Sequence, residues 1–334
     1  MFNWFVAISA FFWIALLLLP WRPWSTRERL RINDPGLDPD RDLSAITALI
    51  PARNEATCIA DTLRKLADQG RFARVVVIDD QSDDGTGDLA RATQLANLTV
   101  IAGSPPPEGW SGKLWALDQG LGYCESSYLM LLDADIGLQP GAVPALLNQL
   151  ETNQLDMASV MANLQMEQFW EKLLLPPFVY FFKLIYPFAL ASSPSSRVAA
   201  GAGGFAIVRT EKLRAIGGFA ALKDAIIDDC TLARLIKESP GRIWIGLSND
   251  ARALRPYQNL GNICNIVART AYTQLRYSRA LLIGCTLLMV LSYVVPILAL
   301  FSPSSNSQLL GAIALSAMLG SYLPTVRYYG LPAY

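Results

Sequence analysis

The chain has 334 residues, of which 52% are hydrophobic and 17% are charged. Soluble domains usually have about 25% charged residues, so this composition indicates a chain that lies partly in a membrane. The 28 basic and 28 acidic side chains balance, so no basic field attracts nucleic acid and we expect no nucleic-acid partner. The sequence has no histidine, which excludes Ser-His-Asp hydrolysis, Cys-His proteolysis and ordinary zinc sites. Any chemistry therefore depends on carboxylates, Lys, Arg, Tyr or a hard cation such as Mg²⁺ or Mn²⁺.

The first apolar stretch, residues 2–20, has about the length that a bilayer crossing requires. A cleaved signal peptide is the alternative, but no positive charge precedes the stretch and no small-residue cleavage site closes it. Trp21 and Trp24 follow it, as aromatic anchors do at a membrane interface. We therefore expect residues 1–21 to form an N-terminal transmembrane anchor.

Two further stretches, residues 280–301 and 309–326, predict two transmembrane helices within 280–326, with a buried helical hairpin as the alternative. The last stretch contains small residues suited to close helix packing. They are Gly311, Ala312, Ala314, Ala317 and Gly320. The stretch 169–190 is aromatic but interrupted by prolines and carries Lys172 and Lys183, so we expect it to lie in the interface.

Arginines predict the orientation, because cytoplasmic loops are enriched in basic residues. They follow the first span and precede the second, whereas the connection 302–307 has no charge. The sequence therefore predicts a multi-pass protein of the cell inner (plasma) membrane, with residues 21–279 and the C-terminus cytoplasmic. The arginines in question are Arg22, Arg27, Arg29, Arg31, Arg269, Arg276, Arg279 and, after the third span, Arg327.

Residues 45–240 alternate short β-branched runs with amphipathic stretches. We expect strands at 45–50, 74–78, 99–102 and 128–132, and helices at 56–69 and 84–95. This alternation predicts an α/β fold with a parallel, doubly wound sheet that binds its ligand at the carboxyl ends of the strands. We expect a catalytic domain at 40–250, followed by an amphipathic interface region at 251–279. The five cysteines (Cys58, Cys124, Cys230, Cys264 and Cys285) form no C-x-x-C pair, and we expect buried free thiols.

Polar clusters follow the predicted strands. Residues 51–55 (P-A-R-N-E) and 79–86 (D-D-Q-S-D-D-G-T) offer carboxylates to a base or a ribose, or are ordinary turns. Asp133 and Asp135 end an apolar strand, where side chains two residues apart project to one side and can face one divalent cation. A diphosphate would supply further oxygens, while the alternative is a pair of turn-capping acids.

Each of three other clusters has a functional and a purely structural interpretation. Lys113, in G-W-S-G-K, meets a phosphate or is a solvated helix lysine. The glycines of 200–205, Gly203 and Gly204 among them, permit close approach to a ligand or form a flexible turn. Asp228 and Asp229 begin a predicted helix, where acids stabilise the helix dipole, or one of them is a general base, since no histidine is available.

Taken in order, these clusters resemble the inverting family-2 glycosyltransferases with the GT-A fold, over about residues 45–280. The resemblance implies nucleoside binding by Pro51, Glu55 and Asp80. It places Asp133 near the nucleotide and Asp135 on a Mg²⁺ or Mn²⁺ ion. It makes Asp229 the catalytic base, with Asp228 where a glutamate is usual. We expect Lys113 and Arg276 to contact the leaving group, and Gly203, Gly204 and Asp228 to lie on the acceptor side.

The stretch 273–277 (T-Q-L-R-Y) departs from the Q-x-x-R-W of processive members, which disfavours polymer synthesis. The segment 269–278, the G-W-S-G-K block and the N-terminal anchor look most like the hopene-associated glycosyltransferases. This resemblance implies transfer from a nucleotide sugar, expected to be a UDP-sugar, to a hopanoid or isoprenoid lipid at the cytoplasmic membrane face. The alternatives are a processive polysaccharide synthase and a non-catalytic nucleotide-sugar-binding membrane protein.

Overall fold

The computed structural model describes residues 2–33, 37–38, 41–256 and 260–332, with the backbone alone at 266, 269 and 270. Residue 40, the expected start of the catalytic domain, and the side chain of Arg269 lie outside the described residues. The chain divides into two compact units. The helical unit consists of Met1–Arg27, Glu167–Ala189 and Gln258–Tyr334, and the sheet unit of Glu28–Met166 and Leu190–Tyr257.

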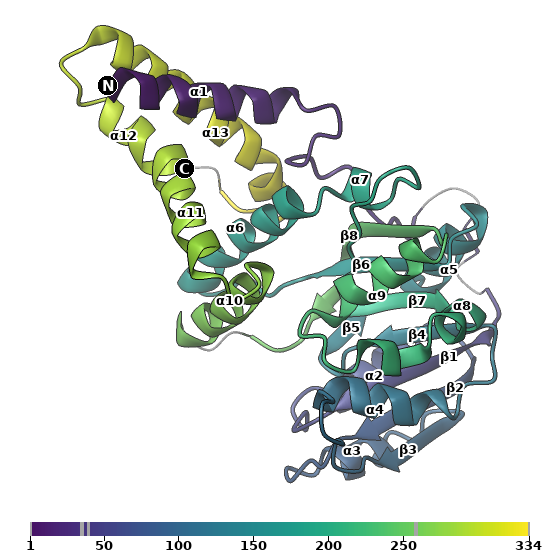
Figure 1. Ribbon diagram of the computed structural model, residues 1–334. Helices are drawn as coiled ribbons and strands as arrows, with labels where there is room; N and C mark the ends of the chain where they lie inside the picture. Colours follow the sequence, from purple (N-terminus) through teal and green to yellow (C-terminus); the bar gives the residue numbers. More distant parts are fainter. Residues whose placement is uncertain (1, 34–36, 39–40, 257–259, 333–334) are drawn as a thin grey trace. The chain divides into compact units, whose positions relative to one another are not determined.

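The sheet unit is built on an eight-stranded sheet in the order β3-β2-β1-β4-β7-β6-β8-β5 (Figure 1). Its strands are β1 (Leu43–Ala52), β2 (Phe72–Asp79), β3 (Leu98–Ala102), β4 (Tyr128–Leu132), β5 (Ile136–Leu138), β6 (Met157–Asn163), β7 (Phe205–Arg209) and β8 (Ile243–Ala253). The four strands expected from the sequence lie within β1 to β4. The apolar side chains of β1, β2 and β4 are mostly buried on both faces, as the strands of a covered parallel sheet require, whereas β3 lies at the edge of the sheet and is half-buried.

The sheet is mixed, so the expectation of an all-parallel sheet is wrong. β1 pairs in parallel with β2 and β4, and β2 with β3. β7 runs antiparallel to both β4 and β6, and β5 antiparallel to β8. An antiparallel neighbour needs no crossover helix, and the chain enters β7 from a glycine-rich loop, not from a helix.

Helices cover both faces of this sheet (Figure 1). One hydrophobic core joins β1 and β2 to the inner faces of α2, α3 and α5, and a second lies under α4, α8, η1 and α9. These helices are α2 (Ile59–Ala67), α3 (Thr86–Ala92), α4 (Gly112–Leu121), α5 (Ala142–Thr152), α8 (Thr210–Ala215), η1 (Gly218–Leu222) and α9 (Asp228–Glu238). Because both faces are covered, the open part of the sheet is the edge at which β1, β2 and β4 end.

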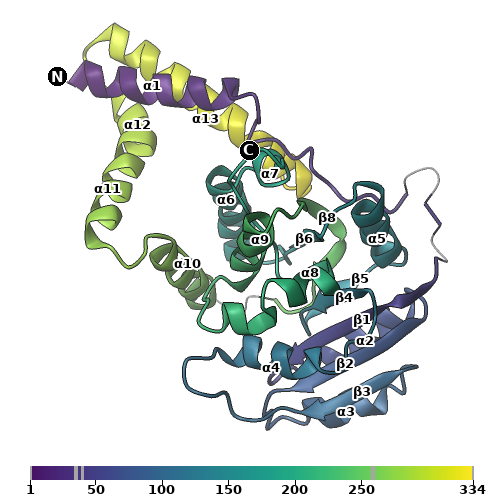
Figure 2. The same cartoon turned by 45° about the vertical axis from the view of Figure 1, so that its right-hand side comes forward.

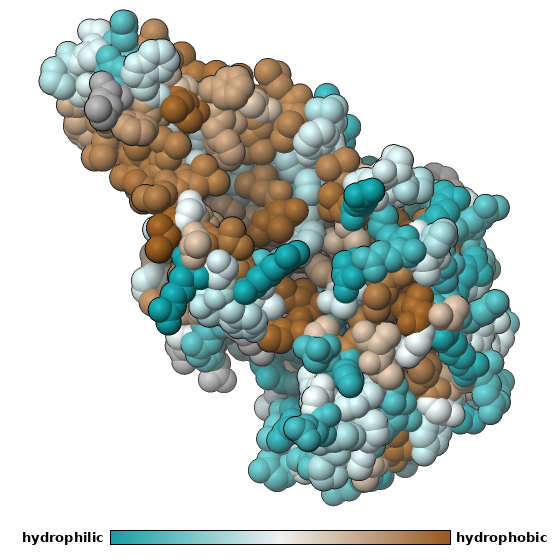
Figure 3. Space-filling model, in the orientation of Figure 1, coloured by the Kyte–Doolittle hydropathy of each residue, from teal (hydrophilic) through white to brown (hydrophobic). Residues whose placement is uncertain are grey.

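Among the described residues of the helical unit, two helices are long and apolar enough to cross a membrane, Arg279–Ala299 and Ser305–Tyr328. The first consists of α11 (Arg279–Met289), a π-helical turn η2 (Val290–Val294) and α12 (Val295–Ala299), and the second is α13 (Ser305–Tyr328). The unit also holds α1 (Phe2–Leu18), α6 (Phe169–Ile185) and α10 (Leu260–Gln274), while α7 (Phe188–Ala191) contains the boundary between the units. Large hydrophobic side chains are exposed along α1, α11 and α13, and this surface is mostly hydrophobic in Figure 3.

The apolar helix α1 lies beside α13 in both views (Figures 1 and 2). Trp13 and Ala314 are buried in their shared core, and the Trp13 ring N–H donates to the carbonyl of Ser292 over 2.8 Å. Gly311 packs so closely that a Cβ there would lie 2.8 Å from the Cβ of Ala299. Of the five small residues singled out, Gly311, Ala314 and Ala317 are buried, whereas Ala312 and Gly320 are exposed.

Helix α6 runs without interruption through Pro176 and Pro177, so the expectation that these prolines break it is wrong. Lys183 is buried and donates to the carbonyl of Ser25, so it is not a lysine that reaches toward water. The cysteine expectation is also wrong in part. Cys58, Cys124 and Cys230 are buried, but Cys264 on α10 and Cys285 on α11 are exposed.

Candidate active site

An open cleft with a volume of about 390 Å³ lies in the sheet unit, where β1, β2 and β4 end. This size falls in the range of about 300–1,000 Å³ that is usual for small-molecule sites. Six of the expected site residues line it: Pro51, Glu55, Asp80, Lys113, Asp133 and Asp135. They come from four separate chain segments, and the parallel strands bring them together at one edge, as open α/β sheets do with their ligand sites.

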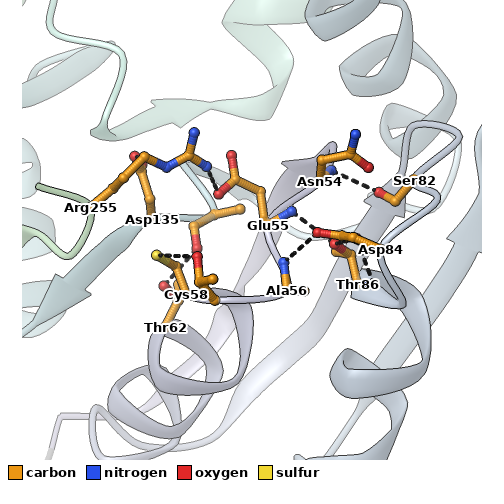
Figure 4. A network of polar contacts seen from close by, with 12 residues as sticks. Asn54, Glu55, Ala56, Cys58, Thr62, Ser82, Asp84, Thr86, Asp135 and Arg255 are labelled. Atoms are coloured by element: carbon orange, nitrogen blue, oxygen red, sulfur yellow. Dashed lines mark hydrogen bonds and ion pairs between the residues drawn. The ribbon is translucent and has the colours of Figure 1, made fainter. Parts of the chain in front are cut away.

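The turn after β1 is held against the turn after β2 by hydrogen bonds (Figure 4). The Asn54 N–H donates to the Ser82 hydroxyl over 3.0 Å, and the Glu55 N–H donates to the Thr86 hydroxyl over 2.8 Å. The Thr86 hydroxyl also donates to Asp84 and thereby lowers the pKa of that carboxyl. Ser82, Asp84 and Thr86 are thus turn-forming residues, and their contacts fix the backbone from which Glu55 reaches into the cleft.

Asp80 is buried to 4% exposure at the floor of the cleft. The Arg53 guanidinium lies 3.7 Å from its Oδ2. Helix α4 begins directly beside it, since a Cβ on Gly112 would lie 3.0 Å from the same oxygen. The other oxygen, Oδ1, accepts a 3.3 Å hydrogen bond from the Gln81 side-chain amide. A carboxylate oxygen has more than one acceptor position, so Asp80 can also accept from a ligand N–H or hydroxyl group. The glycine lets the helix N-terminus, a natural anion site, approach this position.

Asp133 and Asp135 both line the cleft. The sequence suggested that they project from a strand, but they lie beyond its end. β4 ends at Leu132, and the two acids lie in a tight turn in which the Ile136 N–H donates to the Asp133 carbonyl over 3.1 Å. The turn arises because the chain must enter β5 directly after β4. Burial and then the charge of Asp133 raise the pKa of Asp135, as expected for neighbouring carboxylates.

Cationic side chains accompany both acids. Lys113 Nζ lies 2.8 Å from Oδ1 of Asp133 and 3.6 Å from Oδ2 of Asp228. Burial opposes its charge, but Asp133 and Asp228 raise the pKa of Lys113 above its usual value. Arg255 contacts Glu55, and its Nε lies 3.9 Å from Oδ2 of Asp135. The lysine is therefore a cation paired with the acid cluster, and its side chain remains 38% exposed.

The acid pair fits a hard divalent cation in part. Among the residues that the structure describes, no group of three or more His, Cys, Asp and Glu side chains could hold a metal ion. Two carboxylates provide oxygen ligands of the right kind for Mg²⁺ or Mn²⁺, whereas octahedral coordination needs six. Such an ion would complete its coordination with phosphate oxygens and water, as Mg²⁺ usually does in nucleotide sites.

Asp229 lies beside the cleft, at a separate small cavity of about 20 Å³ that has room for about one water molecule. Its Oδ2 accepts a 2.9 Å hydrogen bond from the Gly203 N–H, and its Oδ1 accepts from the Cys230 N–H over 2.7 Å. Asp229 lies in the first turn of α9, where an acid stabilises the helix dipole, but its side chain does not cap the helix. Burial, and next the charge of Asp228, raise the pKa of Asp229 to about 6. A carboxyl with such a pKa suits a general base near neutral pH.

Lys113, Asp133 and Pro51 line both the cleft and the small cavity, and so connect the two. Gly204 is adjacent as well, because its carbonyl accepts the Asp133 N–H over 3.1 Å. The structure thus brings together all the expected site residues except Arg276. Arg276 belongs to the helical unit, and its role stays a prediction.

This arrangement coincides with a match to a family model. The model described as "Glycosyl transferase family 2" matches residues 47–217, about half of the chain. The chain belongs to glycosyl transferase family 2. Membership places it among the glycosyltransferases, and the matched span contains every residue that lines the cleft, from Pro51 to Asp135.

Curated relatives match over a shorter stretch. The 4,4'-diaponeurosporenoate glycosyltransferase of Staphylococcus haemolyticus is 33% identical over 96 residues, which cover 28% of this chain and 25% of that protein. The enzyme of the same name from Staphylococcus aureus is 35% identical over 108 residues, covering 32% of this chain and 28% of the relative. The chain thus matches only about a quarter of the length of these relatives.

One solved structure resembles the whole fold. It is described as the mannosyltransferase PcManGT from Pyrobaculum calidifontis in complex with GDP-Man and Mn²⁺. It aligns with a TM-score of 0.60 and 18% identity over 99% of this chain and 95% of that one. At this identity the likeness concerns the fold, and it supports a GT-A-like α/β architecture.

Two basic residues of this family-2 glycosyltransferase contact cleft residues but are not among the expected site residues. Arg53 lines the cleft and faces Asp80, although the first polar cluster gives it no role by itself. Arg255 follows β8 in a stretch without a motif and contacts the cleft residue Glu55 across 200 residues of sequence. The one feature of the sequence that could have indicated this position is the Arg-Pro pair that comes shortly after the strand.

Proposed function

We propose that the protein is a membrane-bound inverting glycosyltransferase that moves a sugar from a nucleotide sugar to an isoprenoid-type lipid at the cytoplasmic face of the inner membrane. One observation carries the proposal. The acids and the lysine of the family motifs converge on one cleft, and a carboxyl with a raised pKa adjoins it. Inverting transfer needs a donor site, a stabilised leaving group and a base on the acceptor side, and the cleft and its neighbour can supply all three.

On the donor side, Pro51, Glu55 and Asp80 would hold the nucleoside at the ends of β1 and β2. The diphosphate would lie near Lys113 and the N-terminus of α4, where a lysine and free backbone N–H groups both attract anions. A divalent cation held by Asp135 and Asp133 would neutralise negative charge on the departing diphosphate. The expected donor is a UDP-sugar, and GDP-mannose, bound by the structural neighbour, is the second candidate.

On the acceptor side, Asp229 would accept the proton of an attacking hydroxyl. Its two hydrogen bonds to backbone N–H groups fix the carboxylate, so that little reorganisation is needed when the acceptor arrives. Asp228, next to it, would orient the acceptor, and Gly203 and Gly204 would let the acceptor come close. Arg276 would add a positive charge for the leaving group.

The lipid acceptor is supported by the relatives and by the helical unit. The name of the staphylococcal relatives specifies a carotenoid acid, an isoprenoid compound, as what they glycosylate. The two helices long enough to cross a membrane, and the apolar α1, would keep the enzyme where such lipids dissolve. An isoprenoid acceptor covers both carotenoid and hopanoid products, and the second is the narrower expectation from the sequence.

The test is sugar transfer by the purified protein in lipid nanodiscs. It would be incubated with Mn²⁺, a panel of radiolabelled UDP- and GDP-sugars and a bacterial lipid extract, and the products separated by chromatography and weighed by mass spectrometry. We expect one sugar on an isoprenoid lipid. Asp229→Asn is the inactive control, because it keeps the shape and removes the base. A ladder of long products would favour a processive synthase, and binding without turnover would favour a non-catalytic sensor.

A further inference from the structure

Arg255 connects two parts of the candidate donor site that are distant in sequence (Figure 4). It follows β8, whose last residues pair with β5, and the Leu254 N–H donates to the Asp135 carbonyl over 2.7 Å. This backbone contact fixes Arg255 beside the turn that carries the two acids. Its side chain then contacts Glu55 through Nη2 and lies 3.9 Å from Asp135 through Nε.

The guanidinium therefore lies near the Asp135 oxygen that a divalent cation held by this acid would use. Asp135 is the acid expected on the metal, and its Oδ2 faces Arg255 at one side while Asp133 is paired with Lys113 at the other. A metal ion close to Asp135 would meet a like charge at a few ångströms, which costs free energy unless the arginine moves. The Arg255 side chain is 48% exposed, so it has room to turn away from the acid.

A diphosphate changes this balance. Arginine binds phosphate oxygens strongly and with two parallel hydrogen bonds, so a nucleotide in the cleft gives Arg255 a new partner. The metal gains phosphate oxygens as ligands at the same time. These oxygens fill coordination positions that the two carboxylates alone cannot fill. Both effects favour the same exchange, in which the arginine leaves the acid and the metal replaces it.

We propose that Arg255 is a positioning residue that competes with a divalent cation for Asp135 and yields the acid when a nucleotide sugar binds. The inference rests on the proposed function, since it assumes a metal-assisted nucleotide site. Its consequence is coupled binding: Mn²⁺ alone binds weakly, and Mn²⁺ with a nucleoside diphosphate binds tightly. The affinity for Mn²⁺ without nucleotide is then set by a side chain that is not a metal ligand.

The test measures Mn²⁺ affinity by calorimetry and by the electron paramagnetic resonance signal of free Mn²⁺, without nucleotide and with saturating UDP or GDP. Arg255→Gln removes the charge, and Arg255→Lys keeps it. Arg252→Gln is the matched control, because Arg252 lies three residues earlier on β8, is exposed, and donates to the backbone carbonyl of Asn249. Thermal unfolding checks that each variant is folded.

We expect Arg255→Gln to tighten the binding of Mn²⁺ alone by about tenfold, the order expected for a half-exposed unit charge near the ion. The gain from added nucleotide should shrink accordingly. Arg255→Lys and Arg252→Gln should leave Mn²⁺ alone as weak as in the natural protein. Unchanged or weaker binding of Mn²⁺ alone by Arg255→Gln, in a protein whose metal and nucleotide binding are otherwise coupled, would overturn this inference only. If the natural protein bound neither Mn²⁺ nor nucleotide, the proposed function itself would be wrong.

Discussion

The backbone N–H of Gly203 donates to Oδ2 of Asp229 over 2.9 Å, so the glycine-rich loop before β7 holds the candidate base. The neighbouring Gly201 is tighter still. A Cβ at Gly201 would lie 2.6 Å from the backbone carbonyl oxygen of Asp229, whereas a Cβ at Gly203 would lie 3.4 Å from Nζ of Lys113 and 3.5 Å from Oδ2 of Asp229. The two positions therefore differ in how much space they leave for a side chain.

Gly201→Ala should therefore displace α9 at Asp229, because the clash is with backbone that cannot rotate away. We expect a loss of about 1–3 kcal/mol in the free energy of unfolding, the usual effect of overpacking, together with a clear loss of transfer. Gly203→Ala should leave the free energy of unfolding nearly unchanged, because its Cβ contacts would be of ordinary van der Waals length, so that any loss of transfer should come from a hindered acceptor. Thermal unfolding of the two variants checks this, and an equal loss of stability in both would contradict it.

Asp229→Asn keeps the size of the side chain and removes the proton acceptor. It should leave donor binding within a few-fold and lower transfer to a hydroxyl acceptor by roughly 10²–10⁴, the usual contribution of a general base. Asp228→Asn should have a milder effect. Nucleotide titrations and single-turnover rates measure the two effects separately. An inactive Asp228→Asn with an active Asp229→Asn would mean that the roles of the two acids are reversed.

The raised pKa of Asp229 predicts a pH dependence. The carboxyl must be ionised to accept a proton, so transfer to a hydroxyl should fall about tenfold per unit as the pH drops below about 6, and level off above it. Because the charge of Asp228 contributes to raising this pKa, Asp228→Asn should move the acid limb to lower pH. An acid limb near pH 4 in the unaltered enzyme would exclude Asp229 as the base.

The sequence predicted well what depends on local patterns. The four strands from β1 to β4 were located within a few residues, because each is a short β-branched run bounded by polar turns. The helices were expected too long: 56–69 is α2 (Ile59–Ala67), and 84–95 is α3 (Thr86–Ala92). Gly85 explains part of this difference, since its left-handed backbone (φ 85°) belongs to the turn and delays the start of α3.

What depends on long-range pairing was not predictable. The antiparallel direction of β7 and the pairing of β5 with β8 follow from how distant segments meet, which no periodicity encodes. The same holds for Arg255, whose partner Glu55 is 200 residues away. The motif residues were found because each follows its own strand or begins its own helix. Their convergence is a property of the sheet, and it became visible only in three dimensions.

The carboxylates of the turn after β4 predict metal dependence. Mn²⁺ should tighten the binding of a nucleoside diphosphate, and Asp135→Ala should remove that gain without abolishing the metal-free affinity. Asp61→Ala is the matched control, because Asp61 is exposed on α2 and pairs with Arg64 within its own helix. Calorimetry with and without Mn²⁺ checks this, and equal nucleotide affinity in both conditions would refute a metal role for Asp135.

The arginine distribution predicts the membrane topology, and the structure supplies suitable reporter positions. Thr152 is exposed at the end of α5 in the sheet unit, and Ser305 is exposed at the start of α13. Cys264 and Cys285 are exposed and would be replaced by serine first, so that they do not react. A single cysteine is then introduced at Thr152 or at Ser305. Asn3 is left unaltered, so that the hydrogen bond from the Ser307 hydroxyl to its side chain is kept.

With residues 21–279 cytoplasmic, a membrane-impermeant maleimide should label Ser305→Cys in intact cells and Thr152→Cys only after the membrane is opened. The reason is the positive-inside rule, since arginines flank the sheet unit on both sides while the connection 302–307 has none. A cleaved signal peptide would instead export the sheet unit and expose Thr152→Cys in intact cells. Labelling of both positions in intact cells would mean that the sheet unit is exported, and the proposed access to cytoplasmic nucleotide sugars would be lost with it.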